Sequence, residues 1–166
     1  MLRYGIPSYR LPGTILDAEI RNILDLGIEL KCNTVVGRDV SYDELKNEYA
    51  AIFVSIGAHR GMKLGLENED APNVWTGTEF LNKVNSGEPP EVGDHLVAIG
   101  GGDTAIDAVR LARRLGAKAT ILYRRSRTEM PAIDEEIGGA EVEGVEFHFL
   151  AAQGYAVIAS NPRGST

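Results

Sequence analysis

The sequence has a single cysteine, Cys32, so the chain cannot form an internal disulfide. No histidine stands at metal-ligand spacing from it, and a lone cysteine is usually a small buried apolar residue. The sequence also lacks a signal peptide and any apolar run long enough to cross a bilayer. We therefore expect a cytoplasmic protein with no metal site, no disulfide and no membrane partner.

Positive charge is also scarce. The 17 lysines and arginines face 24 acidic residues, which leaves a formal net charge of −7. Nucleic acids and anionic membranes attract basic surfaces, so this balance argues against either as a general partner. A length of 166 residues suits one domain or two small ones, and such a chain can bury about 70% of its unfolded surface.

What the sequence does contain is half of a dinucleotide-binding pattern, "LVAIGGGDTAIDAVRLARRLGAKATILYRRSR", at residues 96–127. Hydrophobic periodicity predicts strands over 96–100 and 120–123, with an amphipathic helix over 104–115 between them. A partly helical segment is expected at 131–144, followed by a strand at 145–150. Alternating strands and helices are typical of an α/β fold with a parallel sheet.

The turn between the first strand and the helix fits G-x-G-x-x-A. In this motif the first glycine permits a tight turn, the second allows backbone to approach a pyrophosphate, and the small third residue lets the helix lie close to the sheet. The helix N-terminus offers unpaired N–H groups to the anion. The simpler alternative is an ordinary turn with no ligand. The motif consists of Gly100, Gly101, Gly102, Asp103, Thr104 and Ala105.

One residue of the motif, Asp103, is unexpected beside a phosphate because the two anions would repel each other. We expect its carboxylate to point sideways and to cap or hydrogen-bond backbone.

The nature of the nucleotide depends on the end of the second strand. NAD-binding versions carry an acidic residue about 20 positions after the turn, where it binds the ribose 2′-hydroxyl. Here the strand ends at Tyr123, Arg124 and Arg125 follow it, and Arg127 is close behind. Guanidinium groups bind phosphate in bidentate fashion, so the pattern favours NADP(H). The alternative is a solvated basic tip without a ligand.

The N-terminal half has weaker patterns. A helix beginning near Thr14 and ending near Gly27 is predicted, followed by a strand at 28–33. Ser41 and Glu44 form a capping-box pattern that predicts a short helix to about residue 48. The continuous apolar run at 50–58 is typical of a buried parallel strand. One further short helix is expected near residues 76–87.

Taken together, these segments resemble the NADPH–flavin oxidoreductase family that includes the glutamate synthase small (beta) subunit. The same module occurs in dihydropyrimidine dehydrogenase. The likeness is carried by "AIGGGDTAIDAVRLARRLGAKATILYRRSRTEMPA" and, in the family's order, by "MLRYGIPSYRLP", "NTVVGRDVSYDEL" and "AIFVSIGAHRGMKLGLENED". It implies electron transfer from NADPH to FAD and onward to iron–sulfur clusters and a partner subunit.

The resemblance also implies flavin contacts in the N-terminal half. For most of these positions the alternative is a local structural role, and no side chain is expected to act as acid, base or nucleophile. The family's own first GxGxxG unit and its closing flavin segment are not in the sequence. The implied flavin neighbours are Arg3, Tyr4, Gly5, Ile6, Pro7, Val36, Ile56 and Gly57.

We therefore expect a remnant of a flavin-binding domain at 1–60, a linker at 61–93, a partial Rossmann-like βαβ unit for NADP(H) at 94–150, and an atypical tail at 151–166. The tail resembles prolyl-oligopeptidase-type peptidases near their "NPRGS" loop, but a G-x-S-x-G nucleophile motif is lacking. The main hypothesis is an NADP(H)-binding fragment that needs a missing flavin half or large subunit for turnover. The alternative is an inactive fragment that self-associates through open sheet edges.

Overall fold

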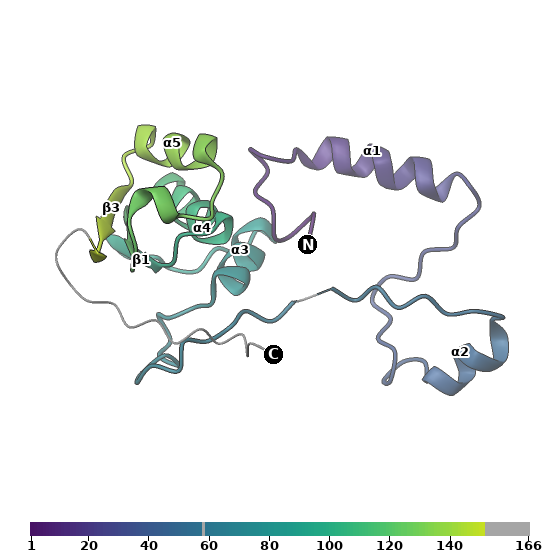
Figure 1. Cartoon of the computed structure of the whole chain (residues 1–166). Helices are drawn as coiled ribbons and strands as arrows, with labels where there is room; N and C mark the ends of the chain where they lie inside the picture. The colour runs from purple at the N-terminus through teal and green to yellow at the C-terminus, as the bar shows by residue number, and fades with distance from the viewer. Residues whose placement is uncertain (58, 152–166) are drawn as a thin grey trace.

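The computed structural model describes residues 1–57 and 59–151, and the prediction for the tail beyond residue 151 lies outside them. The chain divides into an α/β body and an arm that extends away from it (Figure 1). The arm carries helices α1 (Gly13–Leu24) and α2 (Tyr42–Glu48). The body contains α3 (Gly77–Asn85), β1 (His95–Ile99), α4 (Asp103–Arg114), β2 (Lys118–Tyr123), a 3₁₀ turn (Arg127–Glu129), α5 (Asp134–Val142) and β3 (Glu146–Phe149).

The sheet of the body is parallel, with strand order β1-β2-β3. Val97 lies opposite Thr120, and Ile121 lies opposite Phe147. Since strand succeeds strand through α4 and then α5, the unit is β-α-β-α-β with β2 in the centre. This confirms the expected α/β fold class with a partial Rossmann-like unit.

The core of the body forms where α4 and α5 cover one face of the sheet. Ile106 and Val109 of α4, Ile121 of β2 and Ile137 of α5 are fully buried. Helix α3, the short helix expected near residues 76–87, lies against α4 and contributes Phe80 and Leu81 to the same core. Small alanines along α4 allow the close approach that the motif requires.

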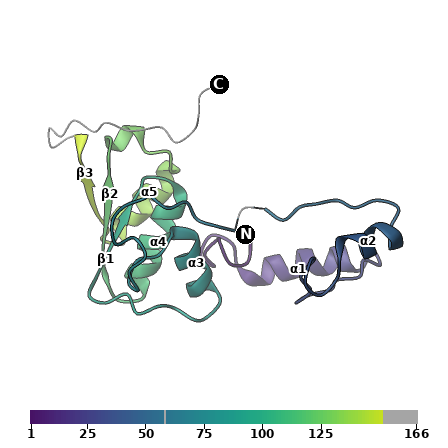
Figure 2. The same cartoon turned by 90° about the horizontal axis from the view of Figure 1, so that it is seen from below.

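The opposite face of the sheet is not covered by any described helix (Figure 2). Val97 and Ile99 of β1 remain 52% and 58% exposed there. His95 bonds through its Nε2 atom to the Thr120 hydroxyl, 2.8 Å away, on that face. Parallel sheets in α/β proteins are normally covered on both faces, so this face differs from the usual arrangement.

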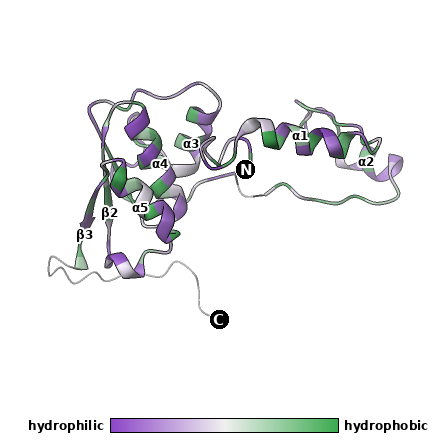
Figure 3. Cartoon of the chain, turned by 90° about the horizontal axis from the view of Figure 1, so that it is seen from above, coloured by the Kyte–Doolittle hydropathy of each residue, from purple (hydrophilic) through white to green (hydrophobic). Residues whose placement is uncertain are grey.

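The arm differs most from the sequence-based expectation. The strands predicted at 28–33 and 50–58 are wrong for the residues that the structure describes there, because both stretches are irregular and Phe53 is 91% exposed. A β-strand needs a neighbour to satisfy its backbone groups, and the described residues place none beside these stretches. Apolar residues consequently lie exposed along the arm (Figure 3).

The capping predictions in the arm had mixed outcomes. Ser41 accepts from the Glu44 N–H while Glu44 accepts from the Ser41 N–H, so the capping box of α2 is confirmed. The helix expected to begin near Thr14 begins at Gly13 after Pro12, so Thr14 lies inside α1 and does not cap it. Cys32, expected to be buried, is exposed. No described helix combines the length and the apolar character that crossing a bilayer requires.

The core of the body makes a direct stability prediction. Replacing the fully buried Ile106 with alanine removes three buried carbon atoms and leaves a cavity, so we expect a loss of about 2–5 kcal/mol in the free energy of unfolding. Urea denaturation followed by circular dichroism measures it. The control is Ile23→Ala on the half-exposed face of α1, for which we expect a change within about 0.5 kcal/mol. Equal losses in both variants would contradict the assigned core.

Candidate functional site

The glycine-rich turn lies between the end of β1 and the start of α4. Gly100 donates its N–H to the Leu122 carbonyl, and Gly102 is the N-cap of α4 with no side-chain cap. Among the described residues, no acceptor is bonded to the backbone N–H groups of Gly101, Gly102, Asp103 or Thr104. The turn therefore presents a cluster of free donors at the positive end of the helix dipole, as a bound phosphate requires.

A side chain would meet a different environment at each of the three glycines. Gly100 has φ of +150°, which disfavours a side chain, and it faces the methyl group of Ala105. At Gly101 a Cβ atom would lie 2.7 Å from the ring of Tyr123, so that position has no room. At Gly102 a Cβ atom would meet nothing closer than Pro131, at 4.0 Å. Gly102 is thus open on the side where the motif brings a pyrophosphate to the backbone.

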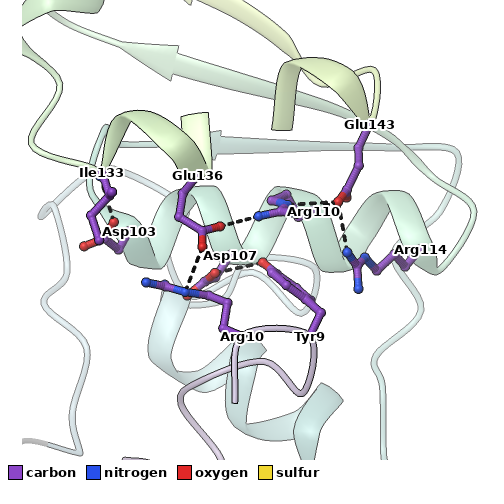
Figure 4. Close-up of polar contacts among 9 residues, drawn as sticks. All are labelled: Tyr9, Arg10, Asp103, Asp107, Arg110, Arg114, Ile133, Glu136 and Glu143. Carbon is purple, nitrogen blue, oxygen red and sulfur yellow. Dashed lines mark hydrogen bonds and ion pairs between the residues drawn. The ribbon is translucent and has the colours of Figure 1, made fainter. Parts of the chain in front are cut away.

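Asp103 points sideways, as expected. Its carboxylate accepts a hydrogen bond from the Ile133 N–H at 3.1 Å, and Ile133 is the N-cap of α5 (Figure 4). The neighbouring Ala132 N–H bonds to the Gly101 carbonyl at 3.1 Å. The segment before α5 is therefore fastened to the glycine turn by two hydrogen bonds, and Asp103 has a structural role there.

The basic residues after β2 divide into two groups. Arg124 and Arg125 are exposed, and neither forms a hydrogen bond or ion pair with another described residue. Arg127 is already engaged, because its guanidinium donates to both carboxylate oxygens of Glu141 at 3.0 and 3.2 Å. The structure therefore leaves Arg124 and Arg125 available for an anion, and Arg127 much less so.

The loop that carries these arginines is held by local contacts. Glu129 accepts hydrogen bonds from the Ser126 N–H and hydroxyl, which lower the pKa of its carboxyl group. The Tyr123 hydroxyl donates to the Glu129 carbonyl at 2.9 Å, while its ring lies against Gly101. Tyr123 consequently links the arginine loop to the glycine turn, and the two halves of the predicted nucleotide site have a common support.

The predicted flavin neighbours lie on three separate segments. Residues 3–7 form a loop on the body, where Pro7 is fully buried and the Tyr4 carbonyl accepts from Asn85 of α3. Val36 lies in the arm, where it is 55% exposed and bridges to Val40. Ile56, 75% exposed, and Gly57, with φ of +65°, lie on the stretch that returns from the arm. Neither the hollow beside Arg113 and Arg114 nor the one beside Trp75 is lined by any of them.

A cluster that the sequence reasoning missed lies on the outer face of α4 (Figure 4). The Asp107 carboxylate accepts from the Tyr9 hydroxyl and from Arg10, both at 2.8 Å. Asp107 is only 3% exposed. The available signal was a single acidic residue inside the otherwise apolar run "AIDAV".

Comparison with known proteins fits this geometry. The family model of the pyridine nucleotide-disulphide oxidoreductases matches residues 10–153. The chain belongs to this family. The match includes the glycine turn, the arginine loop and Asp107 with Arg10, whereas the first nine residues, Tyr9 among them, and the last thirteen lie outside it.

Individual relatives are similar over nearly the whole chain. The "NADPH-Fe(3+) oxidoreductase subunit beta" of Geobacter sulfurreducens is 44% identical over 153 residues, which cover 90% of this chain and 23% of that protein. The "Glutamate synthase [NADPH] small chain" of Escherichia coli is 40% identical over 161 residues, covering 90% of this chain and 34% of that protein. These matches confirm the family resemblance, and the chain spans between a fifth and about a third of such relatives.

Among solved structures, a "2-Naphthoyl-CoA Reductase" complex matches 79% of this chain and 19% of its own with a TM-score of 0.60. The sequences are 20% identical, so this similarity supports the fold alone.

The crowding at Gly101 makes a prediction with a matched control. In Gly101→Ala the new methyl group overlaps the Tyr123 ring, so we expect the free energy of unfolding to fall by about 1–3 kcal/mol. In Gly138→Ala, on α5, the methyl group meets no atom within 4 Å, and we expect a gain of about 0.5–1 kcal/mol. Thermal denaturation of both variants checks the pair. A Gly101→Ala protein as stable as the parent would contradict the assigned contact.

Proposed function

We propose that this chain is an NADP(H)-binding portion of a flavin-dependent oxidoreductase, in which it receives the nucleotide that supplies electrons to FAD. The observation that carries the proposal is the pairing of free backbone N–H groups at the start of α4 with Arg124 and Arg125 after β2. The first group suits a pyrophosphate and the second a 2′-phosphate. The printed names of the relatives, which include NADPH-dependent enzymes, support the same nucleotide.

The residues present fit this ligand. Gly102 leaves space next to the backbone donors, and Asp103 turns its charge toward Ile133. No acidic side chain hydrogen-bonds to Arg124 or Arg125 within the described residues, so an incoming phosphate does not have to break an existing ion pair to reach them. The chemistry of hydride transfer belongs to the cofactors, and this chain binds and orients the nucleotide.

A partner is part of the proposal, because the arm exposes apolar surface that a soluble protein normally buries. Phe53, Val54 and Ile56 are 91%, 65% and 75% exposed along one stretch. We infer that further flavin-domain sequence or a second subunit covers this stretch and completes the flavin site. The partial coverage of the relatives, which are named as subunits or chains, supports this inference.

Arg124 and Arg125 should give the chain a higher affinity for NADP⁺ than for NAD⁺. In wild type we expect calorimetric titration to show tighter binding of NADP⁺. Arg124→Ala/Arg125→Ala should lose about 10–100-fold in NADP⁺ affinity, since two charge-assisted contacts to phosphate disappear. NAD⁺ affinity should stay unchanged, and Arg127→Ala should lose less because Glu141 already occupies that guanidinium. Equal affinity of wild type for both nucleotides would refute the role of the pair.

The Gly102→Ala variant tests the proposed position of the pyrophosphate. Gly102→Ala has room in the free protein, so its free energy of unfolding should stay within about 0.5 kcal/mol of wild type. The methyl group fills the side from which the pyrophosphate approaches, and NADP⁺ affinity should fall by about tenfold or more. Calorimetry and thermal denaturation on the same sample measure the two quantities. Unchanged NADP⁺ binding would place the nucleotide elsewhere.

A further inference from the structure

The buried carboxylate of Asp107 lies in the second turn of α4, where Ile106 and Val109 beside it are fully buried. Burial raises the pKa of this carboxyl group, while Tyr9 and Arg10 lower it. A buried charge is tolerated only when it is paired and hydrogen-bonded. The helix therefore depends on partners from elsewhere in the chain to keep this group in place.

Both partners come from one short loop at the other end of the sequence, which we define as the N-terminal loop, residues 4–11. The Tyr9 hydroxyl donates to one carboxylate oxygen at 2.8 Å, and the Arg10 guanidinium donates to the other at 2.8 Å. The Leu11 N–H bonds back to the Pro7 carbonyl at 3.1 Å and gives the loop its turn. Undocking the loop would remove both donors from Asp107 at once.

The loop also engages α5 and the outer face of α4 (Figure 4). Arg10 lies 3.2 Å from Glu136, which itself pairs with Arg110. The Tyr9 ring lies under two guanidinium groups, at 4.3 Å from Arg110 and 3.9 Å from Arg114. The last acid of the cluster, Glu143, accepts from both of these arginines at 2.7 and 2.9 Å. Three arginines thus balance three carboxylates between the loop and the two helices.

The same helix carries the proposed nucleotide site. Asp107 follows the N-cap Gly102 by five residues, about 7.5 Å along the axis. Asp103, one turn earlier on α4, holds the start of α5. The N-terminal loop in turn includes Tyr4 to Pro7, which are implied neighbours of the flavin. Helix α4 therefore connects the glycine turn proposed for the nucleotide to the N-terminal loop implied to lie near the flavin.

We propose that Asp107 is a positioning residue that couples the N-terminal loop to the glycine turn, so that nucleotide binding at the turn and docking of the loop favour each other. This inference rests on the proposed function. Coupling between two sites is reciprocal: whatever the nucleotide adds to loop docking, docking adds to nucleotide affinity. A purely structural anchor would hold the loop equally with and without the nucleotide.

The test combines amide hydrogen exchange of residues 4–11 with calorimetric titration of NADP⁺, on wild type, Asp107→Asn and Tyr9→Phe. Tyr9→Phe keeps the ring beneath the arginines and removes only the hydroxyl, so it covers the case in which Asp107→Asn fails to fold. In wild type we expect NADP⁺ to slow exchange at Arg10 and Leu11. In both variants that slowing should be lost, with NADP⁺ affinity lower by about 5–150-fold.

The control is Asp43→Asn on α2, a carboxylate that is 85% exposed and far from the loop, for which we expect wild-type affinity and protection. Unchanged NADP⁺ affinity in Asp107→Asn or Tyr9→Phe, together with unchanged protection on binding, overturns the coupling while the proposed function stands. Faster exchange of the loop with an unaltered NADP⁺ response assigns Asp107 a structural role only and also overturns it. No NADP⁺ binding in wild type removes both proposals.

Discussion

The hydrogen bonds from Tyr9 and Arg10 to Asp107 are the interaction on which the arrangement of the two ends of the chain depends. Together with the contacts of Arg10 to Glu136 and of Tyr9 to Arg110 and Arg114, they hold the first dozen residues to helices α4 and α5, which begin at Asp103 and Asp134. The contacts are charge-assisted and largely shielded from water, which makes each of them stronger than a surface ion pair. The N-terminal loop thereby becomes part of the body, while the arm that follows it does not.

The body and the arm consequently differ in how far their apolar side chains are buried. In the body, α4 and α5 cover one face of a three-stranded parallel sheet and bury a continuous core. In the arm, helices α1 and α2 form from local signals, but only Leu16 among the apolar residues of α1 is buried. The uncovered face of the sheet, with Val97 and Ile99, has the same character as the arm. Both surfaces expose large apolar side chains to solvent.

The proposed nucleotide site does not depend on the arm, because all of its parts lie on the body. Backbone N–H groups, a helix dipole and two free guanidinium groups suffice to bind an anion, and none requires an acid, base or nucleophile. The supports of the site are equally local: Tyr123 lies between the turn and the arginine loop, and Asp103 holds the segment before α5. The implied flavin neighbours, in contrast, are divided between loop and arm.

The sequence by itself determined the β-α-β-α-β order, the glycine turn, the capping box at Ser41 and the arginines after β2, because periodicity, glycine spacing and caps act over a few residues. It failed for the strands expected at 28–33 and 50–58, since a strand exists only when a neighbour supplies its hydrogen bonds. Only the tertiary structure decided that Arg127 is engaged by Glu141 and that Asp107 is buried against Tyr9 and Arg10. Those contacts join residues 14 to 98 positions apart, a separation over which no local pattern specifies which groups will meet.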